Sequence, residues 1–66
     1  MKLGNNLREH RKEHGLTQAG LAELAKVSRK TINTVENGVF VPSTILALTI
    51  AKVLETSVDE LFYLDS

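Results

Sequence analysis

The sequence contains no cysteine and no tryptophan, and only one proline. Without cysteine, disulfide bridges and thiolate metal sites are excluded. No apolar run approaches the roughly 18 residues that cross a bilayer, and the N-terminus lacks the apolar stretch of a signal peptide. We therefore expect a cytoplasmic protein with no membrane partner. Its 66 residues, 42% of them hydrophobic and 24% charged, suit a single domain spanning 1–66.

Net charge is absent as well, because eight basic residues balance eight acidic ones. A nonspecific polycation is therefore an unlikely class of protein for this chain. The charges are unevenly distributed, since residues 1–35 carry a net +4 and residues 36–66 a net −4. The first half is suited to face phosphate, while the second half is suited to face solvent or a partner.

Apolar periodicity predicts several short helices joined by tight connections. Leu3 and Leu7 are spaced i, i+4, His10 and His14 continue that stripe, and Gly15 stops it, which predicts a helix over about 5–14. Further helices are expected at about 18–25, 29–37 and 44–54, each with apolar residues at helical spacing. A loop over 39–42 separates the last two of these helices.

Side-chain caps mark the starts of the later helices. Thr17, Ser28 and Ser43 each precede a predicted helix and can accept a hydrogen bond from its first turn. Ser57 with Glu60 reads as a capping box that opens a last short helix. We expect this helix to carry Val58, Leu61 and Phe62, which makes five helices in an all-α bundle.

The second and third predicted helices form a pair separated by a short turn, with the small Ala22 inside the first. This pattern describes a helix-turn-helix, in which close helix crossing requires a small side chain. With Ile32 in the core, the helical period places a polar set on the opposite face, with Arg29 at the start of the helix: Lys30, Asn33, Thr34 and Asn37. Lys and Arg suit guanine, Asn suits adenine, and a Thr methyl suits thymine.

Several runs of the chain carry a family resemblance. They are Gly15-Leu16-Thr17-Gln18, Leu21-Ala22-Glu23, Val27-Ser28-Arg29-Lys30-Thr31-Ile32, Glu36-Asn37-Gly38, Pro42-Ser43, Leu46-Ala47-Leu48, Ile50-Ala51-Lys52 and Ser57-Val58-Asp59-Glu60-Leu61-Phe62. Together they resemble the Cro and phage-repressor type of helix-turn-helix over nearly the whole chain. The resemblance implies a five-helix dimeric regulator of transcription, in some members extended by a small sheet from the two chain ends.

The same resemblance implies a role for each matching residue. Gln18 is expected to bond a phosphate and to brace the recognition helix, and Arg11 with Glu36 is expected to form a structural ion pair. Base-reading positions correspond to Arg29, Lys30 and Thr34. Backbone-contacting or capping positions correspond to Ser28, Thr31 and Asn37.

Three departures from the family pattern stand out. Lys26 occupies a turn position that usually holds Gly or Asn, where a left-handed backbone costs about 1 kcal/mol. Gly20 replaces a usual acidic residue. Val39-Phe40-Val41 replaces a polar, often basic loop, so we expect few phosphate contacts and a modest dependence of DNA affinity on salt.

An excess of apolar residues falls on the segments after the recognition helix. These side chains either complete a small core or form a subunit interface, and we favour the interface because so short a chain cannot enclose all of them. The residues expected at the interface of a homodimer are Val39, Phe40, Val41, Ile45, Phe62, Tyr63 and Leu64. A short sheet is an open alternative for the two chain ends, in which the tail Phe62-Tyr63-Leu64 would pair with Met1-Lys2-Leu3.

The leading interpretation is a homodimer that binds double-stranded DNA at a palindromic operator and acts as a repressor, with no cofactor. An antitoxin-like module that binds a protein and regulates its own operon is the main alternative. An enzyme is disfavoured, since no nucleophile, phosphate loop or carboxylate pair is evident. His10 and His14 lack a third ligand, so no metal site is expected.

Overall fold

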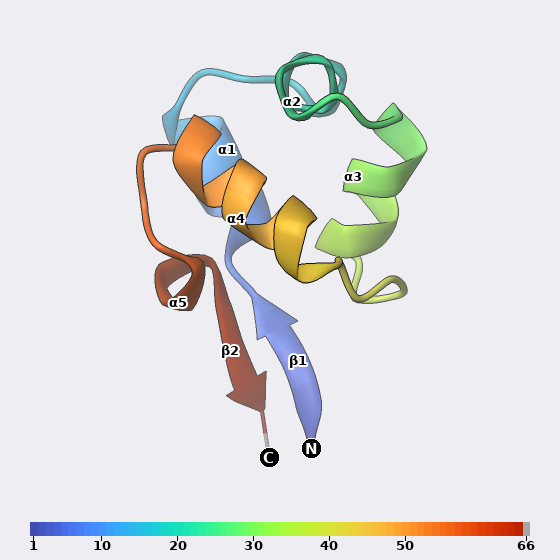
Figure 1. The fold of residues 1–66 in the computed structure, drawn as a ribbon, viewed down its shortest axis with the longest axis vertical. Helices are drawn as coiled ribbons and strands as arrows, with labels where there is room; N and C mark the ends of the chain where they lie inside the picture. The colour runs from blue at the N-terminus through green and yellow to red at the C-terminus, as the bar shows by residue number, and fades with distance from the viewer. Residues whose placement is uncertain (66) are drawn as a thin grey trace.

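Five helices and a two-stranded sheet make up the fold, in a computed structural model that describes residues 1–65 (Figure 1). The elements in chain order are β1 (Lys2–Asn5), α1 (Leu7–Glu13), α2 (Gln18–Ala25), α3 (Arg29–Glu36), α4 (Thr44–Val53), α5 (Val58–Leu61) and β2 (Phe62–Asp65). The five predicted helices are therefore present. The all-α expectation is right for the helices, and the short β pairing of the chain ends that the sequence left open is confirmed, because they form an antiparallel pair of strands. None of the helices within residues 1–65 has both the length and the apolar character to cross a membrane.

The first helix is shorter than predicted. It begins at Leu7 rather than near residue 5, and Leu3 lies in β1 instead of on the helix. Asn5 marks the change of structure, since its Oδ1 accepts a hydrogen bond from Leu7 N at 3.1 Å while its Nδ2 donates to Val35 O at 3.0 Å. The i, i+4 spacing of Leu3 and Leu7 was thus misleading, because pairing with Phe62–Asp65 holds residues 2–5 extended.

Three of the four predicted side-chain caps are confirmed. The side chains of Thr17, Ser28 and Ser43 accept hydrogen bonds from the first turns of α2, α3 and α4. The prediction of a capping box at Ser57 is wrong, because the Ser57 side chain makes no hydrogen bond to the first turn of α5. In this single-turn helix the main-chain oxygen of Ser57 already accepts from the amides of Glu60 and Leu61, at 3.2 and 3.3 Å.

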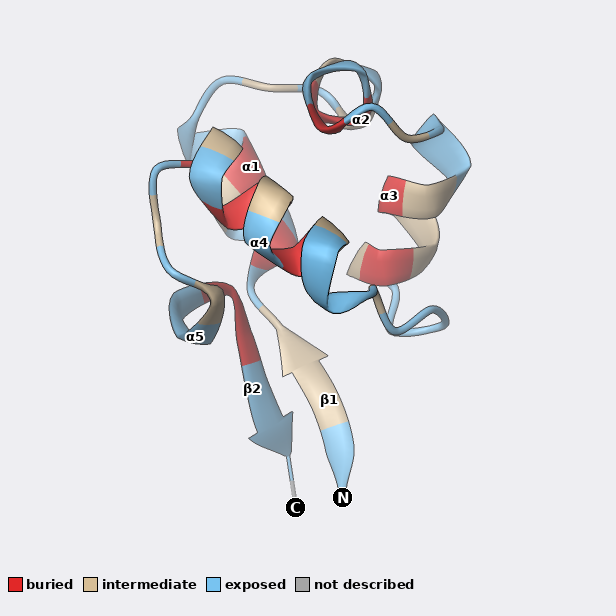
Figure 2. Cartoon of the chain, viewed as in Figure 1, coloured by how far each residue is buried: buried red, intermediate tan, exposed pale blue. Residues whose placement is uncertain are grey.

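The hydrophobic core lies between the helices, with the sheet extending from one end (Figure 2). Its fully buried side chains come from every helix: Leu7, Leu21, Ile32, Val35, Ile50 and Leu61. Ala22 is buried on α2, as its small size predicts for a close helix crossing. Burial of Ile32 and Val35 fixes which face of α3 points inward, and so which face remains outward.

The C-terminal strand contributes to both the core and the surface. Phe62 is buried and belongs to the core of its own chain, so its expected place among exposed interface side chains is wrong. The reason is the β pairing, which opposes Phe62 to Asn5 and turns its ring toward the helices. Tyr63 and Leu64 remain exposed, as an interface would require.

Gly4 and Tyr63 face each other across the sheet and depend on each other's shape. Tyr63 is the cross-strand partner of Gly4, and its ring occupies the space where a Cβ on residue 4 would lie. An aromatic ring that covers a glycine in this way compensates for the missing side chain. The sheet thus tolerates Gly4 because Tyr63 fills the gap.

We expect Gly4→Ala to lower the free energy of unfolding by about 1 kcal/mol, because the Tyr63 ring must move away. In a Tyr63→Ala background the same change should cost nothing or be stabilising, since the space is free and alanine restricts the unfolded chain. Chemical denaturation of the four proteins measures this coupling. An equal cost of Gly4→Ala in both backgrounds would show that the ring does not fill this site.

Candidate nucleic-acid interface

The candidate interface is the outward face of α3. Ser28 caps this helix, Ile32 and Val35 bury its inner side, and Asn37 with Gly38 ends it. Gly38 has φ +74, the left-handed conformation that terminates helices at low cost when the residue is glycine. The face left outward combines exposed Arg29, Lys30 and Asn37 with the half-buried side chains of Thr31, Asn33 and Thr34.

Three hydroxyl groups on or next to this face, those of Ser28, Thr31 and Thr34, already make hydrogen bonds within α3 and its cap. Thr34 Oγ1 donates to the main-chain oxygens of Lys30 and Thr31, both at 3.0 Å. Its methyl group is therefore the part of the side chain left for an external contact, which agrees with a thymine-contacting role. Ser28 Oγ lies 2.9 Å from Thr31 Oγ1, so both hydroxyls serve the cap.

A buried carboxylate fixes the position of α3 in the fold. The Glu36 side chain has no exposed surface, and its Oε2 lies 2.6 Å from Arg11 Nε. Arg11 is itself buried and also donates from Nη1 to Leu16 O at 2.8 Å. The predicted ion pair between the first and third helices is therefore confirmed.

Gln18 links this carboxylate to the outer face of α3. Its Nε2 donates to Glu36 Oε1 at 3.1 Å and to Asn33 Oδ1 at 3.2 Å, while its Oε1 accepts from Arg29 Nη1 at 3.4 Å. The prediction that Gln18 braces the recognition helix is confirmed by these bonds. Whether Gln18 also contacts a phosphate stays a prediction.

Arg8 is the residue that sequence reasoning missed. Its Nε donates to Glu36 Oε1 at 3.3 Å and its Nη2 to Asn37 Oδ1 at 3.0 Å. The available signal was its spacing from Arg11, because residues three apart on a helix share a face. Asn37 also donates from Nδ2 to Asn33 Oδ1 at 3.4 Å, so the amides of α3 belong to the same network.

Opposing effects act on the ionisation of Glu36. Burial disfavours its charged form, but hydrogen bonds from Arg11, Gln18 and Arg8 outweigh burial and hold the pKa of the carboxyl below its ordinary value. A lowered pKa in the folded state means that ionised Glu36 stabilises the fold above the unfolded pKa. This stabilisation is lost as the pH falls toward the folded pKa.

The turn between α2 and α3 contains Lys26 in a left-handed conformation, with φ 60 and ψ 43. This is the backbone that the family position requires, and for a residue with a side chain it costs roughly 1 to 2 kcal/mol. Its main-chain N–H bonds to the oxygens of Ala22 and Glu23, which closes the end of α2. Val27 N then bonds to Ala22 O at 3.0 Å, so the turn is held tightly.

The two histidines are not gathered into a cluster of ligands. His14 Nε2 lies 3.2 Å from Glu55 Oε1, which is a single neighbouring carboxylate. Within residues 1–65, no three His, Cys, Asp or Glu side chains come together as a metal site would need.

Two crossing helices, a capped second helix with one buried face, and a tight left-handed turn between them define a helix-turn-helix. The family model for the helix-turn-helix HTH_3 matches residues 7–61. An uncharacterized HTH-type transcriptional regulator of Methanothermobacter thermautotrophicus is 50% identical over 60 residues, which cover 89% of this chain and 87% of the relative. The protein therefore belongs to the HTH_3 family, and the resemblance to Cro and phage repressors is confirmed.

Solved structures give the same result for the fold. The restriction-modification controller protein C.AhdI from Aeromonas hydrophila superposes with a TM-score of 0.77 at 35% identity, over 82% of each chain. SinR, a master regulator for biofilm formation solved in complex with DNA, gives a TM-score of 0.75 at 30% identity, over 80% of this chain and 86% of that one. A putative DNA-binding protein from Bacteroides fragilis, at 23% identity and a TM-score of 0.84, shares the fold over 92% of this chain.

We expect Glu36→Gln to lower the free energy of unfolding by about 3 kcal/mol at pH 7, because buried Arg11 loses its counter-ion. The difference in free energy of unfolding between wild type and variant should shrink between about pH 5 and pH 3, because protonation of Glu36 removes its stabilising charge from the wild-type protein. Denaturation curves across this pH range measure the effect. Glu9→Gln, on the exposed face of α1, is the control and should change little. A deficit for Glu36→Gln that stays constant with pH would contradict a stabilising ionised carboxylate.

Proposed function

We propose that this protein binds double-stranded DNA sequence-specifically as a homodimer, represses transcription from a palindromic operator, and acts in the cytoplasm, where the chromosome lies. The observation that carries the proposal is the outer face of α3, where Arg29 and Lys30 are exposed beside Asn33 and Thr34, two residues suited to base edges. Arginine or lysine can donate to guanine, asparagine can bond adenine, and the Thr34 methyl can contact thymine. SinR, a similar structure, was solved in complex with DNA.

The proposed residues divide by role. Arg29, Lys30, Asn33 and Thr34 would read bases, because they lie on the outward face of α3. Gln18, Ser28, Thr31 and Asn37 would contact phosphate or hold the helix in place. The network on Glu36 supports this division, since it orients the Asn33 and Arg29 side chains before any duplex arrives.

The homodimer is supported by apolar surface on the part of the chain that follows α3. Val39 and Ile45 are each 78% exposed, and Val41 and Leu64 are 66% and 70% exposed. Phe40 and Tyr63 are about half exposed. Apolar side chains this large are costly to leave in water when they gather on one face, so a second copy of the chain is the proposed cover.

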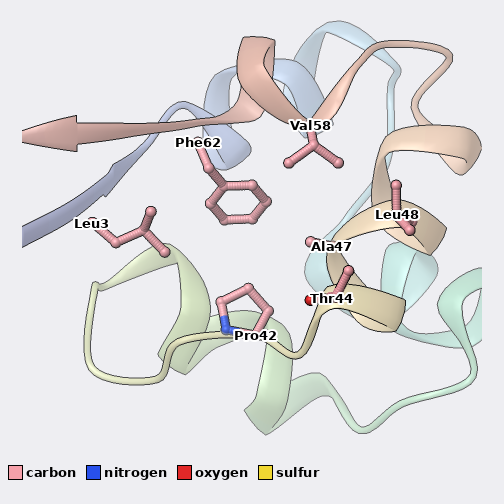
Figure 3. Close-up of a pocket in the computed structure, with 7 residues that line it drawn as sticks. All are labelled: Leu3, Pro42, Thr44, Ala47, Leu48, Val58 and Phe62. Carbon is pink, nitrogen blue, oxygen red and sulfur yellow. The ribbon is translucent and has the colours of Figure 1, made fainter.

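A pocket lies on this same part of the molecule (Figure 3). Its volume is about 300 Å³, and its walls are apolar apart from one threonine: Leu3, Pro42, Thr44, Ala47, Leu48, Val58 and Phe62. A symmetric interface needs a projection and a recess on one surface, and exposed Ile45 directly follows the pocket residue Thr44 on α4. Phe62 thus contributes to the proposed interface as a wall of the pocket rather than as an exposed side chain.

A two-fold axis on this side leaves both recognition helices free. The proposed interface and the outer face of α3 come from different segments, so dimerisation and DNA binding need not compete. Two such helices would enter major grooves about one helical turn, or roughly 34 Å, apart, which explains a palindromic operator. A dimer seated there would block polymerase access, which is the simplest mode of repression.

We expect Arg29→Ala and Lys30→Ala each to cost about 1 to 3 kcal/mol of binding energy on the preferred operator and to relax base preference. Gln18→Ala should weaken binding to operator and scrambled duplex more evenly than these two changes, because its proposed contact is with a phosphate and it affects base reading only through Asn33 and Arg29. Fluorescence anisotropy with both duplexes makes the comparison. If all three variants lose equal affinity on both duplexes, the assignment of base-reading residues is wrong.

We expect Ile45→Glu to dissociate the dimer while leaving the chain folded, since Ile45 is exposed in one copy. Ile45 occurs twice in a symmetric interface, so the loss should reach about 3 kcal/mol, or a hundredfold in the dimer dissociation constant. Sedimentation and circular dichroism measure association and folding. Leu24→Glu, an exposed leucine of α2 outside the proposed interface, should remain dimeric. A wild-type protein that sediments as a monomer at micromolar concentration overturns the dimer.

A further inference from the structure

Two residues other than glycine have a positive φ within residues 1–65, Lys26 and Glu55. Glu55 has an evident partner, because its Oε1 lies 3.2 Å from His14 Nε2. Lys26 is exposed, and in the described part of the chain its ammonium group has no carboxylate within 4.0 Å. The turn explains the left-handed backbone of Lys26, but glycine would adopt that backbone without strain, so a lysine with no ion pair inside the fold is a reason to look for an external contact.

Lys26 lies close to the base-reading residues. The turn that it occupies leads directly into the start of α3, with Arg29 three residues further along the chain (Figure 1). On the helices before this turn, Arg8 and Arg11 are both committed to Glu36. The stretch 26–30 contains three exposed cations, Lys26, Arg29 and Lys30, whereas the loop 38–42 contains none.

We propose that Lys26 contacts a phosphate of the bound duplex, next to the bases read from the start of α3. This inference rests on the proposed function and adds a residue to it. A left-handed residue in the turn lets the chain hold α2 and α3 close together, and a lysine there places a flexible cation at the edge of the groove. Glycine would relieve the strain, but it would remove the phosphate contact.

Three substitutions separate the charge of Lys26 from its backbone conformation. Lys26→Gly removes both the charge and the strain, Lys26→Gln removes the charge alone, and Lys26→Arg keeps the charge. The matched control is Lys52→Gln, which removes an exposed cation at the end of α4, away from α3. Affinity for operator and scrambled duplexes is measured by anisotropy between about 50 and 200 mM salt, a range over which phosphate contacts respond strongly.

We expect Lys26→Gly and Lys26→Gln to lower the steepness of log K against log salt by about one, and to weaken both duplexes by similar factors. Lys26→Arg and Lys52→Gln should keep the wild-type slope. Lys26→Gly should also raise the melting temperature, by up to about 4 to 8 °C, because the strain is relieved. A gain in stability together with a loss of affinity is the signature of a residue retained for binding.

Two results would overturn the inference while leaving the proposed function intact. One is a wild-type slope and affinity in both Lys26→Gly and Lys26→Gln. The other is a loss confined to the operator, which would indicate contact with a base. Failure of the wild-type protein to bind any duplex would instead remove the proposed function together with this inference.

Discussion

The buried carboxylate of Glu36 is the constraint on which the arrangement of the first three helices depends. It receives hydrogen bonds from Arg8 and Arg11 of α1 and from Gln18 of α2, while belonging to α3 itself. One ionised group thus connects three helices that the short chain could hold only weakly by apolar packing. Moving α3 away from α1 would separate Glu36 from buried Arg11 and leave both charges unpaired. Such a displacement is therefore costly in free energy.

The hydrogen bonds on Glu36 also affect the side chains on the outer face of α3. Gln18 bonds to Glu36 and also to Asn33 and Arg29 on the outer face. These two side chains, which we propose read bases, are therefore positioned by the same network that holds the helix. Preorganised donors lose less conformational entropy on binding. The exposed Ile45 and the residues that line the pocket lie outside α3, so the proposed contact with the duplex and the proposed contact with a second copy use different residues.

Local chemistry made most of this fold predictable. The caps at Thr17, Ser28 and Ser43, the burial of Ile32 and the pairing of Arg11 with Glu36 follow from spacing, residue type and family resemblance, and the structure confirms them. The extended state of Leu3 and the burial of Phe62 could not be predicted with certainty, because they depend on pairing between opposite ends of the chain. Arg8 was missed because its spacing of three from Arg11 places it on the same helix face but does not by itself show that its side chain reaches Glu36 rather than water.

The central claim is that a two-fold pair of α3 helices, each held by its Glu36 network, reads a duplex. Selection of bound sequences from a random pool of double-stranded DNA tests this most directly. We expect enrichment of two inverted half-sites whose centres lie about 10 base pairs apart, or one helical turn. Enrichment of a single unsymmetrical site, or of no sequence at all, would contradict the claim.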